Sequence, residues 1–188
     1  IKKADALEIT LYTGKSFSVQ LKQYHTAADM AVLSLNVNTL GSSSKDIYVA
    51  SFGSSSIQSL ICTPVIAMGS PMGERGSVGY GMITSESGQM TMVDANYKVL
   101  LTDIYGSQSA SGFLFNLKGQ IIGIITDRKT STDMRNMITA YGISDLKKMI
   151  STLSEGKKIP YLGITGIDVS ADANEKGNVP LGVYVQDV

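Results

Sequence analysis

The chain of 188 residues has few of the residues from which proteins build cross-links, metal sites and charged surfaces. It has one cysteine, Cys62, which cannot form a disulfide framework, and one histidine, His25, which with that cysteine is too little for a zinc site. Lysine plus arginine and aspartate plus glutamate both number 16, so the formal charge is zero. This balance argues against nucleic acid or an anionic membrane as the main partner. No apolar run approaches the roughly 20 residues that span a bilayer, and no signal peptide is visible.

Short apolar stretches separated by glycine-bearing turns make up most of the chain. Hydrophobic residues account for 43% and charged residues for 17%, which is typical of a globular rather than a disordered protein. Apolar and polar residues alternate over residues 7–11 and 17–21, on either side of a turn at Gly14, and this pattern predicts a β-hairpin. A third strand is predicted over residues 30–37, followed by a polar linker over residues 38–45.

A second series of strands is predicted after this linker, at residues 46–51, 63–69, 78–85, 89–95, 97–104, 112–116, 119–126 and 136–142. Repeated short strands at this spacing indicate an antiparallel barrel. One helix is expected next, with Ser144 capping its first turn and Gly156 at its end. Its apolar face would be formed by Leu146, Met149, Ile150 and Leu153.

Several stretches resemble trypsin-fold serine proteases of the HtrA (DegP-like) family. Residues 101–125, LTDIYGSQSASGFLFNLKGQIIGII, follow the family segment that carries the nucleophilic serine within G-N-S-G-G-P. Residues 65–73, VIAMGSPMG, and 78–85, VGYGMITS, resemble two framework strands of that family. The resemblance implies an all-β protein with a trypsin-like antiparallel β-barrel. The C-terminal barrel would be complete and the N-terminal barrel partial, with one C-terminal helix and the start of a PDZ domain.

The same resemblance divides the chain into three parts. Residues 1–40 would be the partial N-terminal protease barrel, 41–156 the C-terminal barrel with its helix, and 157–188 an incomplete PDZ domain. Earlier strands, including the one that leads to the catalytic histidine, are expected upstream of Ile1. An exposed strand edge is therefore expected to pair with another chain. In a PDZ domain, Leu162, Gly163 and Ile164 would form the peptide-binding loop.

Hydrolysis by a serine triad needs a hydroxyl, an imidazole and an acid that orients the imidazole. Asp29, within HTAADMAVL, matches the family's triad acid, although an aspartate before a strand is also common in loops. Alignment of the serine segment places Ala110 at the nucleophile, where a methyl group cannot attack a carbonyl. Nothing in the chain matches the family's T-x-x-H-V histidine motif, and His25 is interpreted as a loop residue. The resemblance therefore predicts an inactive protein.

The remaining site residues follow from the same alignment. The N–H groups of Gln108 and Ala110 would form the oxyanion hole. Of the family's G-N-S-G-G-P only Gly112 is kept, which indicates natural degeneration rather than one engineered change. A shift of one position would make Ser109 or Ser111 the nucleophile, although serine is also common in turns. The expected specificity pocket, or alternatively a plain core strand, comprises Ala140, Tyr141 and Gly142.

Two functions are consistent with these residues. The first is an HtrA-like serine protease homologue that is catalytically inactive and acts in peptide or protein binding, or in quality control of unfolded proteins. The alternative is an active serine endopeptidase that uses Ser109 or Ser111 with an upstream histidine. Neither needs a cofactor or a metal. By analogy with the family, the protein would be a homo-oligomer outside the cytoplasm, with a membrane anchor in a segment that this chain lacks.

Overall fold

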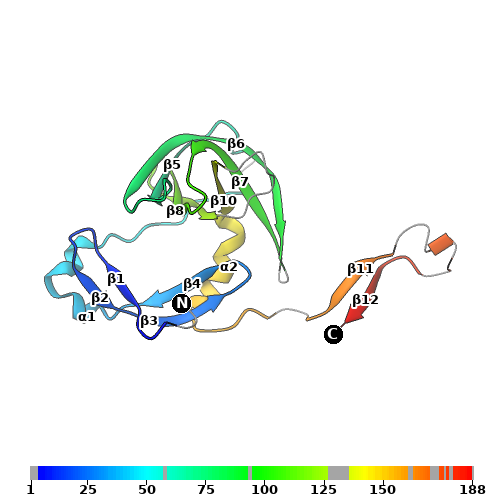
Figure 1. Ribbon diagram of the computed structural model, residues 1–188, viewed down its shortest axis with the longest axis horizontal. Helices are drawn as coiled ribbons and strands as arrows, with labels where there is room; N and C mark the ends of the chain where they lie inside the picture. The colour runs from blue at the N-terminus through cyan, green and yellow to red at the C-terminus, as the bar shows by residue number, and fades with distance from the viewer. Residues whose placement is uncertain are drawn as a thin grey trace.

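The computed structural model describes residues 4–56, 59–92, 95–126, 136–160, 163–169, 174–175, 177 and 180–187. Figure 1 shows a barrel, a pair of small sheets beside it, a helix between them and a separate C-terminal hairpin. None of the helices in these ranges has both the length and the apolar character required to cross a bilayer.

The N-terminal part consists of two antiparallel two-stranded sheets, β1–β2 and β3–β4. Gly14, with φ of 82°, lies in the turn between the first two strands, so the predicted hairpin is confirmed. A short helix, α1, and a 3₁₀ helix, η1, follow. The elements are β1 (Glu8–Thr10), β2 (Ser16–Ser18), β3 (Gln20–His25), β4 (Met30–Ser34), α1 (Val37–Leu40) and η1 (Gly41–Asp46).

Six antiparallel strands close into a barrel with the order β10-β7-β6-β5-β8-β9, which confirms the predicted barrel. They are β5 (Pro64–Ser70), β6 (Ser77–Thr91), β7 (Asn96–Tyr105), β8 (Ser111–Asn116), β9 (Ile121–Thr126) and β10 (Met137–Gly142). Helix α2 (Ile143–Ser154) follows the last strand directly. The hairpin of β11 (Thr165–Asp168) and β12 (Val183–Asp187) lies apart from the barrel (Figure 1). The predicted limits of the three domains stay a prediction.

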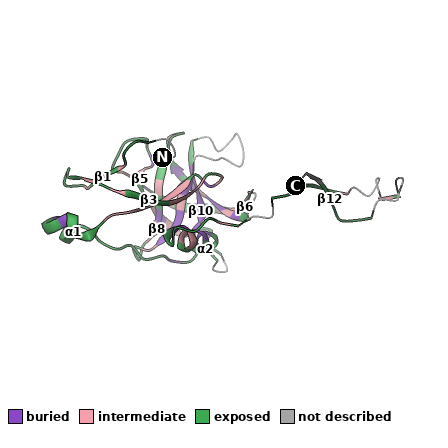
Figure 2. Ribbon diagram, turned by 90° about the horizontal axis from the view of Figure 1, so that it is seen from below, coloured by how far each residue is buried: buried purple, intermediate pink, exposed green. Residues whose placement is uncertain are grey.

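Alternation along the strands fills the barrel with apolar side chains. Figure 2 shows the buried residues of the barrel strands in purple. Two threonines of the barrel strands are also fully buried, and each donates to a backbone carbonyl. Thr102 Oγ1 donates to the Ile138 oxygen at 3.0 Å, and Thr139 Oγ1 donates to the Thr126 oxygen at 3.1 Å. Because both hydroxyls are satisfied locally, they occupy the core without the cost of an unpaired polar group.

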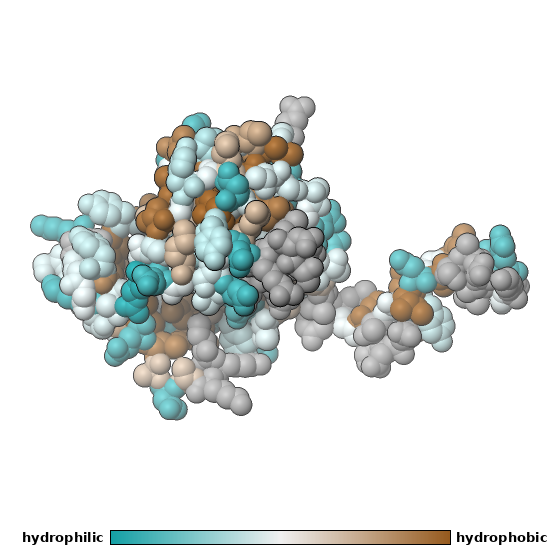
Figure 3. All heavy atoms as spheres, turned by 45° about the horizontal axis from the view of Figure 1, so that its top comes forward, coloured by the Kyte–Doolittle hydropathy of each residue, from teal (hydrophilic) through white to brown (hydrophobic). Residues whose placement is uncertain are grey.

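The outer face of the barrel carries apolar side chains as well. Met68 on β5 lies opposite Val78 on β6 and Phe113 on β8, and these three side chains are 44%, 56% and 41% exposed. Figure 3 shows hydrophobic side chains in brown on the surface of the barrel.

A second apolar cluster joins the two parts of the molecule. The apolar face of α2 packs with Tyr97 and Tyr141 of the barrel, whose rings meet edge to face at 6.1 Å, and with Ala28 from the β3–β4 turn. Gln23 of β3 adds a hydrogen bond from its side-chain amide to the Gly156 carbonyl at 3.2 Å. Helix α2 thereby fixes the β3–β4 hairpin against the barrel.

Several elements predicted from the sequence differ from those in the structure. Residues 47–50, predicted as part of a strand, have no regular structure, and Tyr48 and Val49 are 88% and 96% exposed. Both residue types are common in β-strands, but no strand of the described part of the chain lies beside this segment. Without a neighbouring strand to form backbone hydrogen bonds, the segment does not become a strand. The two strands predicted at 78–85 and 89–95 are one long strand, β6, with irregular register near Ser85 and Gly88. Helices α1 and η1 occupy the whole segment predicted as a polar linker, residues 38–45.

Helix α2 is present as predicted, but its N-terminus is capped differently. Ser144 lies inside the first turn and does not cap it. Instead, the Ser144 N–H donates to Ser55 Oγ at 2.9 Å, and the Ser55 N–H donates to Ser144 Oγ at 2.8 Å. A serine from a distant loop thus supplies the cap. The prediction was wrong because capping was sought only in the adjacent sequence.

Replacing Ser55 by alanine is expected to lower the free energy of unfolding by about 1–2 kcal/mol, because the partly buried Ser144 N–H loses its acceptor. Urea unfolding followed by far-UV circular dichroism measures the change, since the chain has no tryptophan. Ser56→Ala, at an exposed neighbouring serine, is the matched control and should change stability by less than about 0.5 kcal/mol. Equal effects of the two changes would contradict the assigned cap.

Replacing Gly112 by alanine is expected to destabilise the barrel by about 3 kcal/mol or more. Gly112 has φ of 130°, and a Cβ there would overlap the carbonyl oxygen of Met68. Gly119→Ala provides the control, because its φ is 73° but a Cβ would meet nothing within 4 Å. That change should cost only about 1 kcal/mol of backbone strain. Thermal unfolding compares the two, and a smaller loss for Gly112→Ala would argue against the close approach of β5 and β8.

Candidate active site

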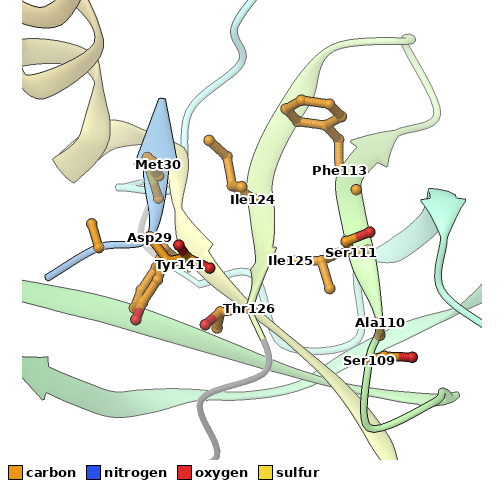
Figure 4. A pocket seen from close by; sticks show the side chains of 12 residues that line it. Asp29, Met30, Ser109, Ala110, Ser111, Phe113, Ile124, Ile125, Thr126 and Tyr141 are labelled. Carbon is orange, nitrogen blue, oxygen red and sulfur yellow. The ribbon is translucent and has the colours of Figure 1, made fainter. Parts of the chain in front are cut away.

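A pocket of about 440 Å³ opens between the start of β4 and the loop that leads into β8. Figure 4 shows Asp29 on one side, Ser109 to Ser111 on the other, and strand β9 between them. The lining residues are Ala28, Asp29, Met30, Ser109, Ala110, Ser111, Gly112, Phe113, Ile124, Ile125, Thr126 and Tyr141. The structure therefore brings together two segments that are about 80 positions apart in the sequence.

Asp29 lies in the tight turn between β3 and β4. Its φ of 51° is left-handed, a conformation that aspartate tolerates better than most residues. Its N–H donates to the Thr26 carbonyl at 3.2 Å, and the Ala28 N–H donates to His25 Nδ1 at 3.1 Å. The imidazole of His25 thus serves as an acceptor within the turn that presents Asp29. The Asp29 carboxylate is directed towards β9 and the pocket (Figure 4).

The loop before β8 is held by hydrogen bonds within the protein. The Ser107 N–H donates to the Pro71 carbonyl at 2.9 Å, and the Ala110 N–H donates to the Ser107 carbonyl at 3.1 Å. The hydroxyl groups of Ser107 and Ser109 are 3.0 Å apart. Residues 107–110 thus form a closed turn, and the Ala110 side chain within it is only 4% exposed.

This turn bears on the predicted oxyanion hole. Stabilising an oxyanion requires two N–H groups that point to one place in the pocket. The Ala110 N–H is already bonded to Ser107, and Gln108 is exposed and does not line the pocket. In this conformation the two amides do not form such a pair, so the oxyanion hole stays a prediction that would require the turn to open.

The alternative nucleophiles both line the pocket. Ser109 Oγ is bonded to the Ser107 hydroxyl and is directed away from Asp29 (Figure 4). Ser111 begins β8 and lies opposite Ser70 of β5. His25, the single histidine of the chain, was expected in a loop but is the last residue of β3, where it pairs with Met30 of β4. The nucleophilic role of either serine stays a prediction.

The three residues expected to form the specificity pocket lie in β10 and have different surroundings. Tyr141 lines the pocket and is 1% exposed, and its buried hydroxyl has no hydrogen-bond partner among the described residues. Ala140 lies in the barrel core, and Gly142 packs against Ser55, where a Cβ would be 2.7 Å from its Oγ. Neither Ala140 nor Gly142 lines the pocket.

The expected PDZ loop is described only in part. Leu162 lies outside the described residues. Gly163 has φ of 71°, and Ile164 is 39% exposed. Peptide binding by this loop stays a prediction.

Sequence reasoning missed much of the apolar wall of the pocket. Met30, Phe113, Ile124, Ile125 and Thr126 line it without having been predicted. Phe113 and Ile124 lie opposite each other on β8 and β9. In the sequence, only the position of these residues next to the segments around Asp29 and Ala110 could have indicated that they line the pocket. Within the described ranges, no group of three or more histidine, cysteine or acidic residues is suited to hold a metal ion.

Comparison with known proteins places this geometry in a family. The family model described as a trypsin-like peptidase domain matches residues 1–124. The serine protease Do-like HtrB of Bacillus subtilis is 30% identical over 206 aligned positions, which cover 100% of this chain and 43% of that protein. The serine protease Do-like HtrA of Lactococcus lactis subsp. cremoris is 29% identical over 180 aligned positions, which cover 88% of this chain and 42% of that protein. The chain thus spans less than half the length of these curated relatives.

Solved structures agree on the fold. The HtrA-type protease AlgW with a decapeptide superimposes with a TM-score of 0.77 at 20% identity, covering 99% of this chain and 57% of that chain. The same protein with a tripeptide gives a TM-score of 0.71 at 22% identity, and the superposition covers 98% of this chain and 61% of that chain. Together with the closed barrel and the family match, these likenesses lead to one conclusion: the chain belongs to the trypsin-like peptidase family and is a member of its HtrA group.

Proposed function

We propose that this HtrA-family chain is catalytically inactive and binds peptides or unfolded proteins. The observation that carries the proposal is that Ala110, which the sequence alignment matches to the family's nucleophilic serine, lines the pocket together with Asp29. Its side chain has no atom that can attack a carbonyl. The chain keeps an aspartate at the position aligned with the triad acid, and a pocket beside it. It has no hydroxyl group at the position aligned with the nucleophile.

The loop around Ala110 supports the same proposal. Its Ala110 N–H is bonded to the Ser107 carbonyl, so the donor that would stabilise an oxyanion is used within the protein. Gly112 is the single residue kept from the family's G-N-S-G-G-P. Loss of the hydroxyl together with this closed turn removes two separate contributions to catalysis.

The proposed ligands follow from the pocket and from the relatives. The pocket walls combine apolar side chains, among them Met30, Ile124 and Ile125, with hydroxyl-bearing residues and Asp29, a mixture that suits a peptide with apolar side chains and a polar backbone. AlgW is known in complex with a decapeptide and with a tripeptide, and the bacterial relatives are named serine proteases. A role in protein quality control, with an incomplete PDZ module over residues 157–188, is consistent with both.

Assembly and location are part of the proposal. The sheets β1–β2 and β3–β4 have two strands each, so each has edges on which another chain can pair. We expect a homo-oligomer placed outside the cytoplasm, by analogy with the family.

An active endopeptidase is the second candidate. It is favoured by one observation, the presence of Ser109 and Ser111 in the same pocket as Asp29. Either serine would need an imidazole as general base, supplied by residues other than those of this chain.

A fluorophosphonate probe separates the two candidates. Because no activated hydroxyl is expected, labelling of the protein should not exceed that of the same protein after heat denaturation. Trypsin under the same conditions is the positive control, and mass spectrometry locates any adduct. An adduct on Ser109 or Ser111 of the native protein would establish the active alternative.

Ala110→Ser is expected to leave hydrolysis of labelled casein undetectable. Among the described residues no imidazole lines the pocket beside the new hydroxyl, and its backbone N–H would still be bonded to Ser107. Release of fluorescent fragments measures the activity, and far-UV circular dichroism verifies that the variant is folded. Hydrolysis by this single variant would show that base and oxyanion donors are present after all.

A further inference from the structure

The nine methionines of the chain fall into two groups by their surroundings. One group packs in the apolar cluster that joins helix α2, the barrel and the β3–β4 hairpin, and it comprises Met30, Met90, Met92 and Met149. The other group lies on the surface, between 40% and 44% exposed, and it comprises Met68, Met72, Met82 and Met137. Met134 lies outside the described residues. Thioether groups are thus present both at the contact that positions the hairpin and away from it.

The attachment of the β3–β4 hairpin relies on apolar contacts. Its side chains Ala28, Met30 and Val32 pack in the cluster around α2. The hydrogen bond from Gln23 to the Gly156 carbonyl, at 3.2 Å, is exposed to solvent. A two-stranded hairpin is marginally stable by itself. A change that makes Met30 polar would therefore weaken the contact that keeps the whole hairpin in place.

Three methionines of the cluster are accessible to a small reagent. Met30, Met90 and Met92, called the joint methionines below, are only partly buried, whereas Met149 is 4% exposed. Met30 also lines the pocket, on the same side as Asp29 (Figure 4). Hydrogen peroxide is little larger than a water molecule. It can therefore reach these side chains while the protein stays folded.

Peroxides convert methionine to its sulfoxide. The sulfur atom takes one oxygen of hydrogen peroxide as the O–O bond breaks, and the other oxygen leaves as water. The sulfur loses two electrons in this step, and the peroxide gains them. The product is polar, and a buried sulfoxide oxygen is costly unless it finds a hydrogen-bond donor. Most side chains of the cluster are apolar, so oxidation favours conformations in which the modified side chain turns to solvent.

We propose that Met30, Met90 and Met92 form a site of reversible oxidation by peroxides, and that their sulfoxides loosen the β3–β4 hairpin from helix α2. Loosening the hairpin displaces the side of the pocket that carries Asp29. Reduction by a thiol-dependent sulfoxide reductase reverses the change, because two thiols supply the electrons and the sulfoxide oxygen leaves as water. The inference goes beyond the proposed function and holds whether or not a peptide binds in the pocket.

The test follows hydrogen exchange of the wild-type protein during a time course with hydrogen peroxide. Cys62 is first blocked with iodoacetamide, because its exposed thiol would also react. Mass spectrometry measures the sulfoxide content of each methionine. Once the joint methionines are oxidised, the amides of residues 20–34 should exchange at least about tenfold faster, while those of β5 keep their rates. Methionine sulfoxide reductases A and B with dithiothreitol should restore the original rates.

Two triple variants separate the joint methionines from the surface ones. The joint variant carries Met30→Leu, Met90→Leu and Met92→Leu, and the surface variant carries Met68→Leu, Met72→Leu and Met82→Leu. Leucine keeps the apolar volume of methionine and cannot form a sulfoxide. After the same peroxide treatment, the joint variant should keep the exchange rates of its untreated form. The surface variant should lose protection over residues 20–34 as the wild-type protein does.

Three results would overturn the proposal. The first is unchanged exchange of residues 20–34 in wild-type protein whose joint methionines are oxidised. The second is a lack of sulfoxide at the joint methionines when the surface methionines are fully oxidised. The third is an equal loss of protection in the two variants. If the joint variant does not fold, the wild-type time course still decides, because it compares samples before and after oxidation of the joint methionines.

Discussion

The packing of helix α2 against both the barrel and the β3–β4 hairpin is the contact on which the pocket depends. Two strands with open edges are marginal on their own, and the apolar face of α2 supplies the surface against which they are held. Ala28 is buried in that cluster, and Asp29 follows it directly. The position of the acid relative to Ala110 is therefore set by a helix that contributes no residue to the pocket.

The barrel could be predicted from sequence because its signals are local. Alternation along the strands and the two aligned motifs were sufficient to indicate β5 to β10 and to select Asp29 and Ala110. The segment at 47–50 shows the limit of this reasoning, because Tyr48 and Val49 have strand propensity but a strand also needs a neighbour. The cap of α2 could not be predicted for a related reason: Ser55 precedes Ser144 by 89 positions, and no local pattern links them.

For the candidate site, the sequence could indicate which residues align with the family's site positions, but not their hydrogen bonds or orientations. The motifs indicated where Asp29 and Ala110 stand, but the hydrogen bond from the Ala110 N–H to Ser107 depends on backbone conformation. The contrast between Tyr141, in the pocket, and Ala140, in the core, also follows from alternation on β10 only once the orientation of that strand is known. Whether a residue lines the site is thus decided by which face of the strand it occupies.

The closed turn at residues 107–110 has a consequence for how long a ligand would stay. An enzyme uses binding energy to favour a strained, short-lived species over the bound substrate. Where the amide that would favour that species is bonded to the protein's own carbonyl, as the Ala110 N–H is here, a peptide bound in the pocket as proposed would meet only contacts suited to its relaxed form. Such a protein would retain and then release its partner chemically unchanged, with a dwell time governed by dissociation alone.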